Sequence, residues 1–208
     1  MNYKNIVIVT AKTNLNLEAF NNEQNYIIGV ERGCLDLINR NIKIDYAIGD
    51  FDKVTEQELE LIKSKVKNIE IWSSEKDYFD GELAILQGRK VSKDAQIIFI
   101  ANATKRYDKN YSIFHFIFKY NLKFINDDSI LFLFDKGTNV LKFDDYQDYT
   151  YVSFISKDNT NITIKGLKYE CENLSLSSYS NSCLSNAFIP YQNGIITSNN
   201  PIICILTK

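Results

Sequence analysis

The sequence contains little of what several common classes of enzyme and membrane protein need. It has a single histidine, His115, which lies among phenylalanine and isoleucine residues and is expected in a core or partly buried structural position rather than in a catalytic role. Its four cysteines include no Cys-x-x-Cys pair, which disfavours a zinc site or disulfide framework and favours reduced thiols. No apolar run approaches the roughly 20 residues of a membrane helix, and the N-terminal apolar run is too short for a signal peptide. We therefore expect a cytoplasmic protein with no membrane partner.

The chain also lacks an excess of either charge. Its 24 basic and 26 acidic residues give a formal net charge of −2 over 208 residues, so the composition predicts no nucleic-acid partner. A GxxxxGK[ST] sequence is absent, which disfavours a P-loop kinase. Any catalysis by this chain is therefore expected to depend on carboxylates, lysine and arginine.

The first two-thirds of the chain alternates between strand and helix patterns. Short apolar runs occupy residues 5–10, 26–30, 45–48, 68–72, 96–102 and 129–134, and helical patterns lie near 33–41, 56–67, 81–91 and 111–122. The second of these helices begins with a capping-box pattern at Thr55 and Glu58. Strands that alternate with helices over such lengths predict βαβ units and a mostly parallel sheet. We assign residues 1–129 to an α/β domain.

The remainder of the chain has no helical periodicity of useful length. Its short apolar runs lie at 131–134, 151–155, 162–164, 195–197 and 202–206. Turn-forming sequences such as Lys136-Gly137 separate these runs. This pattern predicts an all-β second domain over residues 130–208.

Acidic residues follow four of the predicted strands of the α/β domain, and three of these loops also contain lysine or arginine. The loops contain Glu31-Arg32, then Asp50 and Asp52, then Lys76, Asp77 and Asp80, and finally Lys105, Arg106 and Asp108. The carboxyl ends of parallel strands meet at one edge of a sheet, so we expect these loops to converge. Carboxylates suit Mg²⁺, and lysine and arginine suit phosphate. The pattern predicts a site for magnesium and a polyphosphate.

The spacing of the acids supports this site, although simpler interpretations exist. On extended backbone Asp50 and Asp52 project to the same side, and Asp77 and Asp80 come together at the start of a helix. Alternatively, Asp50 and Asp52 could only shape a turn, and Asp80 could only cap its helix. Lone basic residues are usually solvated, and Glu31 could form a local ion pair with Arg32. The joint placement at successive strand ends favours the magnesium site.

Six segments of the chain also carry motif-like sequences. They are GVERG at 29–33, IGDFD at 48–52, EKDYFDGELA at 75–84, RYD at 106–108, GLKY at 166–169 and LSN at 184–186. In this order they resemble the V-D-x-G, G-D-F-D, E-K-D-x-T-D-x-E-x-A, R-x-D, G-L-x-Y and x-S-N motifs of thiamine pyrophosphokinases. G-D-F-D alone is a weak signal, whereas six ordered matches across nearly the whole chain are specific.

The resemblance implies diphosphate transfer from ATP to the hydroxyl of thiamine, which gives thiamine diphosphate and AMP. It implies an α/β domain that binds ATP and Mg²⁺, a C-terminal β-sandwich that binds thiamine, and a homodimer with active sites at the interface. The implied site residues are Asp50, Asp52 and Asp80 for magnesium with Asp77 nearby, Lys76 and Arg106 for the triphosphate, Asp108 and Glu31 at the reacting centre, and Ser185 and Asn186 for thiamine. Asp52 or Asp80 would accept the hydroxyl proton.

Several positions depart from the family pattern. Glu31 stands in place of the usual Asp, Phe79 in place of Thr, and Lys109 in place of His. The loop at 101–109 carries side chains where the family has glycines that let the backbone approach phosphate. These departures keep two alternatives open: a pyrophosphokinase for another alcohol such as a hydroxymethylpterin, and a non-catalytic homologue that binds magnesium nucleotide or thiamine.

Overall fold

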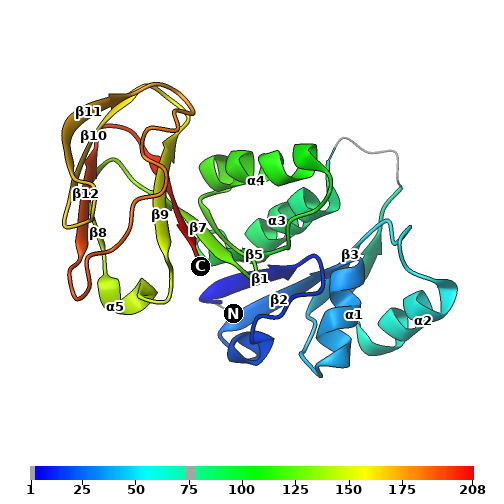
Figure 1. Cartoon of the computed structure of the whole chain (residues 1–208). Helices are drawn as coiled ribbons and strands as arrows, with labels where there is room; N and C mark the ends of the chain where they lie inside the picture. The colour runs from blue at the N-terminus through cyan, green and yellow to red at the C-terminus, as the bar shows by residue number, and fades with distance from the viewer. Residues whose placement is uncertain (1–2, 74–77) are drawn as a thin grey trace. The chain divides into compact units, whose positions relative to one another are not determined.

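The structure is a computed structural model that describes residues 3–73 and 78–208 (Figure 1). Lys76 and Asp77 lie outside the described residues. The chain divides into two compact units, and each is described by itself. Unit 1 comprises Met1–Phe116 and Leu122–Asp127, and unit 2 comprises Ile117–Asn121 and Asp128–Lys208.

Unit 1 contains parallel strands in the order β4-β3-β2-β1-β5-β6. Their bounds are β1 Asn5–Val9, β2 Asn25–Val30, β3 Tyr46–Gly49, β4 Ile69–Ile71, β5 Gln96–Ile100 and β6 Leu122–Ile125. Four consecutive side chains of β1, Ile6 to Val9, are at most 1% exposed, as expected for a strand buried on both faces. The predicted mostly parallel α/β fold is confirmed.

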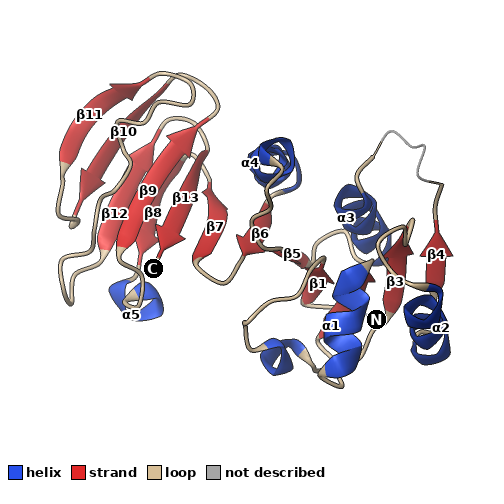
Figure 2. Cartoon of the chain, turned by 45° about the vertical axis from the view of Figure 1, so that its right-hand side comes forward, coloured by secondary structure: helices blue, strands red, loops and turns tan. Residues whose placement is uncertain are grey.

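Helices cover both faces of this part of the sheet (Figure 2). They are the 3₁₀ helix η1 (Leu17–Phe20), α1 (Arg32–Asn39), α2 (Glu56–Lys65), α3 (Asp80–Val91) and α4 (Tyr107–Tyr120). Leu37 of α1 packs in one cluster with Val7 and Val9, whereas Gly88 of α3 lies against Ile6. Because successive strand residues point to opposite faces, α1 and α3 lie on opposite sides of the sheet.

Two local expectations have different outcomes. The capping box at the start of α2 is confirmed, because Thr55 and Glu58 exchange both hydrogen bonds. The expected core or partly buried position of His115 is wrong, because this residue of α4 is exposed. Phe116 and Ile117 are buried instead, and a helix turns each successive residue about 100° away from the last. The aromatic composition of this segment therefore did not fix which side chain faces the core.

Unit 2 is an antiparallel β structure in two layers. Strands β7 (Ser129–Phe134), β13 (Ile202–Thr207) and β9 (Tyr151–Ser156) pair in one layer. The other layer has the order β11 (Cys171–Leu176), β10 (Thr160–Lys165), β12 (Gly194–Ser198) and β8 (Gly137–Leu141), and the short helix α5 (Phe143–Tyr146) follows β8. Phe154 of β9, Ile164 of β10 and Ile196 of β12 belong to one buried cluster, so the layers pack face to face. The predicted all-β second domain is confirmed.

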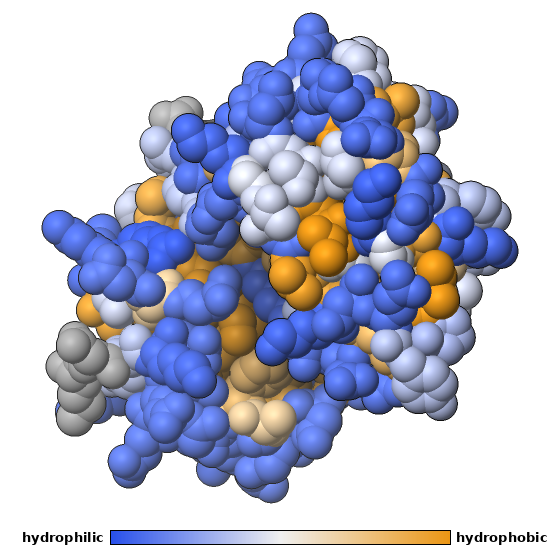
Figure 3. Space-filling model, turned by 90° about the vertical axis from the view of Figure 1, so that its left-hand side faces the viewer, coloured by the Kyte–Doolittle hydropathy of each residue, from blue (hydrophilic) through white to orange (hydrophobic). Residues whose placement is uncertain are grey.

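The surface is chemically mixed. On the face in Figure 3, hydrophobic atoms form patches between hydrophilic ones. Val140 and Ile195 of unit 2 lie opposite each other on β8 and β12 and remain 54% and 46% exposed.

Among the described residues, no helix is both long enough and apolar enough to cross a membrane. The cysteines are free thiols, and Cys34, Cys183 and Cys204 are buried.

Candidate active site

Three carboxylates meet at the carboxyl end of the parallel strands of unit 1. Glu31 follows β2, Asp50 follows β3, and Asp80 is the first residue of α3. Each offers an oxygen, and these three oxygens lie within 4.8 Å of one another. We call these three residues the acid group. The expected convergence of separate loops at this edge therefore holds for Asp50, Asp80 and Glu31.

The backbone around Glu31 is specialised for this arrangement. Glu31 has a positive φ of 46°, which is uncommon for a residue with a Cβ, and its N–H donates to Ile48 O on the neighbouring strand. Gly49 lies directly against it, because a Cβ on Gly49 would stand 2.7 Å from Glu31 Cγ. The glycine of the G-D-F-D sequence thus leaves room for the Glu31 side chain.

Asp80 and Glu31 do not follow the simpler interpretations. The N-cap position of α3 belongs to Phe79, and Asp80 stands in the first turn, where the positive end of the helix dipole favours a carboxylate. Glu31 pairs with Lys53 at 3.2 Å, and Arg32 pairs with Glu58 at 3.4 Å. A local Glu31–Arg32 ion pair is therefore not what holds this turn.

One member of the acid group, Glu31, has a buried oxygen that is unsatisfied within the described part of the chain. Glu31 is 8% exposed, and its Oε1 is buried and accepts no hydrogen bond from the described residues. Burial raises the pKa of Glu31 to about 7, and Asp50 and Asp80, which favour the protonated form of Glu31, add to this rise, while Lys53 opposes it. Three carboxylates with an orphaned buried oxygen form a set of hard ligands that suits a divalent cation.

Asp52 is not a member of the acid group. The residue before it, Phe51, has a φ of 56° and is 5% exposed, so the backbone between Asp50 and Asp52 is not extended. The extended backbone on which the expected projection of both carboxylates depends is therefore absent between these two residues. The Asp52 carboxylate lies 3.4 Å from Lys53 Nζ and is 54% exposed, and its N–H donates to Asp50 Oδ1. The structure thus brings Glu31, and not Asp52, together with Asp50 and Asp80.

Arg106 and Asp108 form an exposed ion pair at the start of α4. Arg106 Nε donates to Asp108 Oδ1 at 2.9 Å, and the two side chains are 63% and 54% exposed. The hydrogen bond from Arg106 lowers the pKa of Asp108. Asp108 is not part of the acid group, and Arg106 has a partner that phosphate would have to replace.

Phe79 and Lys109, two of the departures from the family pattern, contact each other. Lys109 Nζ lies 5.8 Å from the centre of the Phe79 ring, within the range of a cation–π interaction. The contact joins the start of α3, beside Asp80, to the first turns of α4. These two departures therefore form one structural feature.

Sequence reasoning missed Asp127, which connects three loops at the same edge of the sheet. Its carboxylate accepts hydrogen bonds from Thr13 Oγ1, Asn14 N and Nδ2, and Asn102 Nδ2, and its N–H donates to Asn102 Oδ1. Burial acts to raise the pKa of Asp127, but these hydrogen bonds outweigh it and lower the pKa. The available sequence signal was the alternation of Leu122, Lys123 and Phe124 in β6, whose two apolar members are buried. A strand of four residues is too short for this alternation to predict it.

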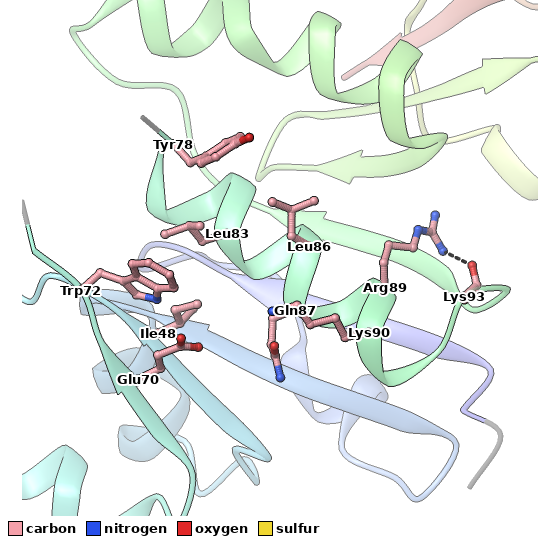
Figure 4. Close-up of a pocket in the computed structure, with 10 residues that line it drawn as sticks. All are labelled: Ile48, Glu70, Trp72, Tyr78, Leu83, Leu86, Gln87, Arg89, Lys90 and Lys93. Carbon is pink, nitrogen blue, oxygen red and sulfur yellow. Dashed lines mark hydrogen bonds between the residues drawn. The ribbon is translucent and has the colours of Figure 1, made fainter. Parts of the chain in front are cut away.

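A cleft of about 740 Å³ lies between α3 and the strands β3 and β4 (Figure 4). Its lining residues are Ile48, Glu70, Trp72, Tyr78, Leu83, Leu86, Gln87, Arg89, Lys90 and Lys93. Trp72 is the only tryptophan of the chain and is 39% exposed, and Tyr78 is 46% exposed. Ile48 and Tyr78 each precede a member of the acid group by two positions, so the cleft adjoins that group.

In unit 2, Asn186 connects two of the motif segments. It is 4% exposed, its Oδ1 accepts from the N–H groups of Tyr169 and Ala187, and its Nδ2 donates to Tyr169 O. Ser185 has a φ of 59°, and its N–H donates to Ser153 Oγ. The amide of Asn186 is thus occupied in holding the turn at 166–169, and the ring of Tyr169 remains 58% exposed.

Family comparisons agree with this division of the chain. A model described as "Thiamin pyrophosphokinase, catalytic domain" matches residues 17–127, and one described as "Thiamin pyrophosphokinase, vitamin B1 binding domain" matches residues 138–203. The chain belongs to the thiamin pyrophosphokinase family. The catalytic-domain match ends at Asp127, the last residue of unit 1, and contains the acid group. The match to the vitamin B1 binding domain lies within unit 2 and contains Tyr169, Ser185 and Asn186.

Individual members of the thiamin pyrophosphokinase family are similar to this chain over most of its length. A thiamine pyrophosphokinase of Bacillus subtilis (strain 168) is 28% identical over 179 residues, which is 83% of each chain. The solved structure of a thiamin pyrophosphokinase family protein from Enterococcus faecalis matches with a TM-score of 0.86 at 19% identity over 98% of each chain. That of thiamine pyrophosphokinase from Bacillus subtilis matches with a TM-score of 0.85 at 24% identity over 99% of each chain. These two structures show the shared fold.

Proposed function

We propose that this chain transfers a diphosphate group from ATP to the hydroxyl of thiamine and releases AMP, with Mg²⁺ held by Glu31, Asp50 and Asp80. The observation that carries the proposal is the acid group inside the region matched by the catalytic-domain model. The second unit, which matches the vitamin B1 binding domain, supports thiamine as the acceptor.

Magnesium fits the chemistry of the acid group. The three carboxylate oxygens lie within 4.8 Å of one another, and Glu31 Oε1 has no donor among the described residues, so a hard cation would supply the missing partner. When bound, the ion offsets the charge that builds up on the transferred phosphate groups. The protein's own part is to bring three carboxylates to one point from β2, β3 and α3.

The basic residues of unit 1 complete the polyphosphate site in this proposal. Arg106 offers a planar guanidinium that can bind phosphate oxygens in pairs, and Lys76 adds a second cation. In the free protein Asp108 holds Arg106 at 2.9 Å, so phosphate displaces Asp108 when ATP binds. Asp80 belongs to the acid group, which leaves Asp52 as the carboxylate better placed to accept the thiamine proton.

Thiamine binding is assigned to the surface formed by Tyr169 and Ser185. Two of the hydrogen bonds made by the amide of Asn186 fix the main chain of Tyr169, and the exposed tyrosine ring offers a face for the cationic thiazolium. Asn186 therefore acts by shaping this surface, and Tyr169 and the Ser185 hydroxyl make the contacts. We place the enzyme in the cytoplasm, where ATP is at hand and thiols stay reduced.

The reaction is tested by incubating the purified protein with Mg²⁺, ATP and thiamine, followed by chromatography of thiamine diphosphate and AMP. We expect the two products in equal amounts and none when Mg²⁺ is removed by a chelator. A hydroxymethylpterin serves as the competing acceptor. Release of AMP with the pterin and not with thiamine would overturn the acceptor, and tight thiamine binding without AMP would overturn the activity.

A homodimer whose active sites combine unit 1 of one subunit with unit 2 of the other is part of the proposal. Asp50→Asn impairs unit 1, and Tyr169→Ala impairs unit 2. Subunits of the two variants, each of low activity, are denatured together and refolded as a mixture. If sites are shared between subunits, one intact site forms in every mixed dimer, and activity returns to about a quarter of the wild-type value. Activity no higher than the mean of the separate variants would argue that each site lies within one subunit.

A further inference from the structure

Lys53 lies beside the acid group and has no role in the proposed reaction so far. It follows Asp52 directly, and its Nζ stands 3.2 Å from Glu31 Oε2 and 3.4 Å from Asp52 Oδ1. One ammonium group therefore bridges two carboxylates that belong to different loops. Exposed lysines usually have no such fixed position, because holding a long side chain costs entropy.

The main chain of Lys53 is held by Arg32, which is itself tied to the start of a second helix. Arg32 at the start of α1 donates from Nη1 to Lys53 O at 2.8 Å. The same guanidinium pairs with Glu58, which forms the capping box at the start of α2 with Thr55. The loop between Asp52 and Thr55 is thus tied to the starts of two helices, and this tie places the Lys53 side chain between Glu31 and Asp52.

The two oxygens of Glu31 face different cationic sites. Oε2 is the atom that pairs with Lys53. Oε1 is the buried atom that accepts no hydrogen bond from the described part of the chain, and Glu31 joins Asp50 and Asp80 in the acid group. A carboxylate that binds one cation through each oxygen is the arrangement by which acids bridge the two ions of a two-metal site. Here an ammonium group of the protein fills one of the two places.

We infer that Lys53 is a positioning residue whose ammonium occupies the place of a second divalent cation between Glu31 and Asp52, so that the protein alone binds one metal ion. The inference rests on the proposed function, because it assumes the metal site of Glu31, Asp50 and Asp80. The ammonium turns the free oxygen of Glu31 toward that site. It also lowers the negative charge of the four carboxylates by one, which weakens the attraction for further cations.

The number of bound Mn²⁺ ions tests this inference without any catalytic assay. Free Mn²⁺ is measured by electron paramagnetic resonance during titration of nucleotide-free protein. We expect one bound ion for the wild type and two for Lys53→Met, with the first bound about tenfold more tightly because a neighbouring positive charge is gone. Lys53→Arg keeps the charge and binds one ion. The control Lys63→Met removes an exposed lysine that pairs with Glu60 on α2 and leaves the wild-type result unchanged.

A double variant locates the second ion. If it binds between Glu31 and Asp52, Lys53→Met combined with Asp52→Asn returns to one ion. Thermal unfolding of each variant confirms that it is folded, and Lys53→Arg retains a test of the charge if Lys53→Met is not. One ion of wild-type affinity in Lys53→Met, two ions in Lys53→Arg, or loss of binding in Lys53→Met alone would overturn the inference. Absence of Mn²⁺ binding from the wild type would overturn the metal site itself.

Discussion

The acid group of unit 1 and Asn186 of unit 2 differ in whether their buried polar atoms have hydrogen-bond partners. In unit 1 no residue within 3–73 or 78–208 donates to a buried oxygen of Glu31, and oxygens of the three carboxylates lie within 4.8 Å of one another. In unit 2 the buried amide of Asn186 uses both of its polar atoms on the main chain of Tyr169 and Ala187. A buried polar group without a partner costs folding free energy, so its presence indicates a ligand. The fully bonded amide indicates a scaffold that positions its neighbours.

The largest effect is expected from removing one charge of the acid group. Asp50→Asn should lower kcat by about 10²- to 10³-fold, because the magnesium site loses a ligand that stabilises charge in the transition state. Asp52→Asn should lower kcat less, by roughly 10²-fold, because it removes the proposed proton acceptor but no member of the acid group. The same Asp50→Asn change should raise the melting temperature of the metal-free protein, since it relieves repulsion among carboxylates. Equal losses of kcat in the two variants would remove the distinction between Asp50 and Asp52.

Removing the amide of unit 2 should act on stability first. Asn186→Ala deletes three partly buried hydrogen bonds to the main chain and should lower the free energy of unfolding by about 2–3 kcal/mol. Ser185→Ala is the matched control at the neighbouring position and should change it by less than about 0.5 kcal/mol. Urea unfolding measures both values. An Asn186→Ala protein as stable as the wild type, with thiamine binding lost, would show that Asn186 binds the ligand directly.

The raised pKa of Glu31 predicts a pH dependence specific to unit 1. Its pKa is about 7 in the folded protein against an ordinary value of 4.5, mainly because of burial. The folded state therefore binds the proton more tightly than the unfolded state. This contribution to stability is complete below pH 4.5 and is lost as the pH rises through 7. Metal-free wild type should lose stability over this window in urea unfolding, and Glu31→Gln should lose less.

Metal binding should show the opposite trend over the same window. Mn²⁺ competes with the proton for Glu31, so its affinity should rise with pH and level off above about 7. A Mn²⁺ affinity that does not change with pH in the wild type would contradict the place of Glu31 in the acid group.

The smallest effect concerns the contact between α3 and α4. Phe79→Thr and Lys109→His each remove the cation–π interaction, and a double-mutant cycle should give a coupling of about 0.5 kcal/mol. Thermal unfolding of the four proteins measures this coupling. Additive effects would show that the two residues departed from the family pattern independently.

Much of the architecture followed from the order of patterns along the chain. The apolar runs gave five of the parallel strands of unit 1, and the Thr55–Glu58 pattern gave the start of α2. β6 was missed because four residues with two buried positions are too few to show a period. Because β6 was not predicted, Asp127 was not recognised as a residue at the end of a strand, and its partners Thr13 and Asn102 are distant along the chain.

The sequence predicted part of the site, namely the part that depends only on where strands end. Strand-end placement was enough to bring Asp50 and Asp80 together, because parallel strands end at one edge. The side of the backbone from which Asp52 projects depends on the positive φ of Phe51, whose ring packs in one buried cluster with Cys34 of α1 and Ile62 of α2. No spacing rule contains this information.

The sequence by itself determined the fold class, the family and the edge of the sheet where acids collect, because these depend on periodicity and on the order of motifs. Tertiary structure alone decided which acids meet and that Lys53 bridges Glu31 and Asp52. It also decided that the Asn186 amide hydrogen-bonds main-chain groups of Tyr169 and Ala187. These outcomes depend on distances between residues on separate loops, and such distances are set only when helices and strands pack. Local pattern selects the elements, and packing selects the neighbours.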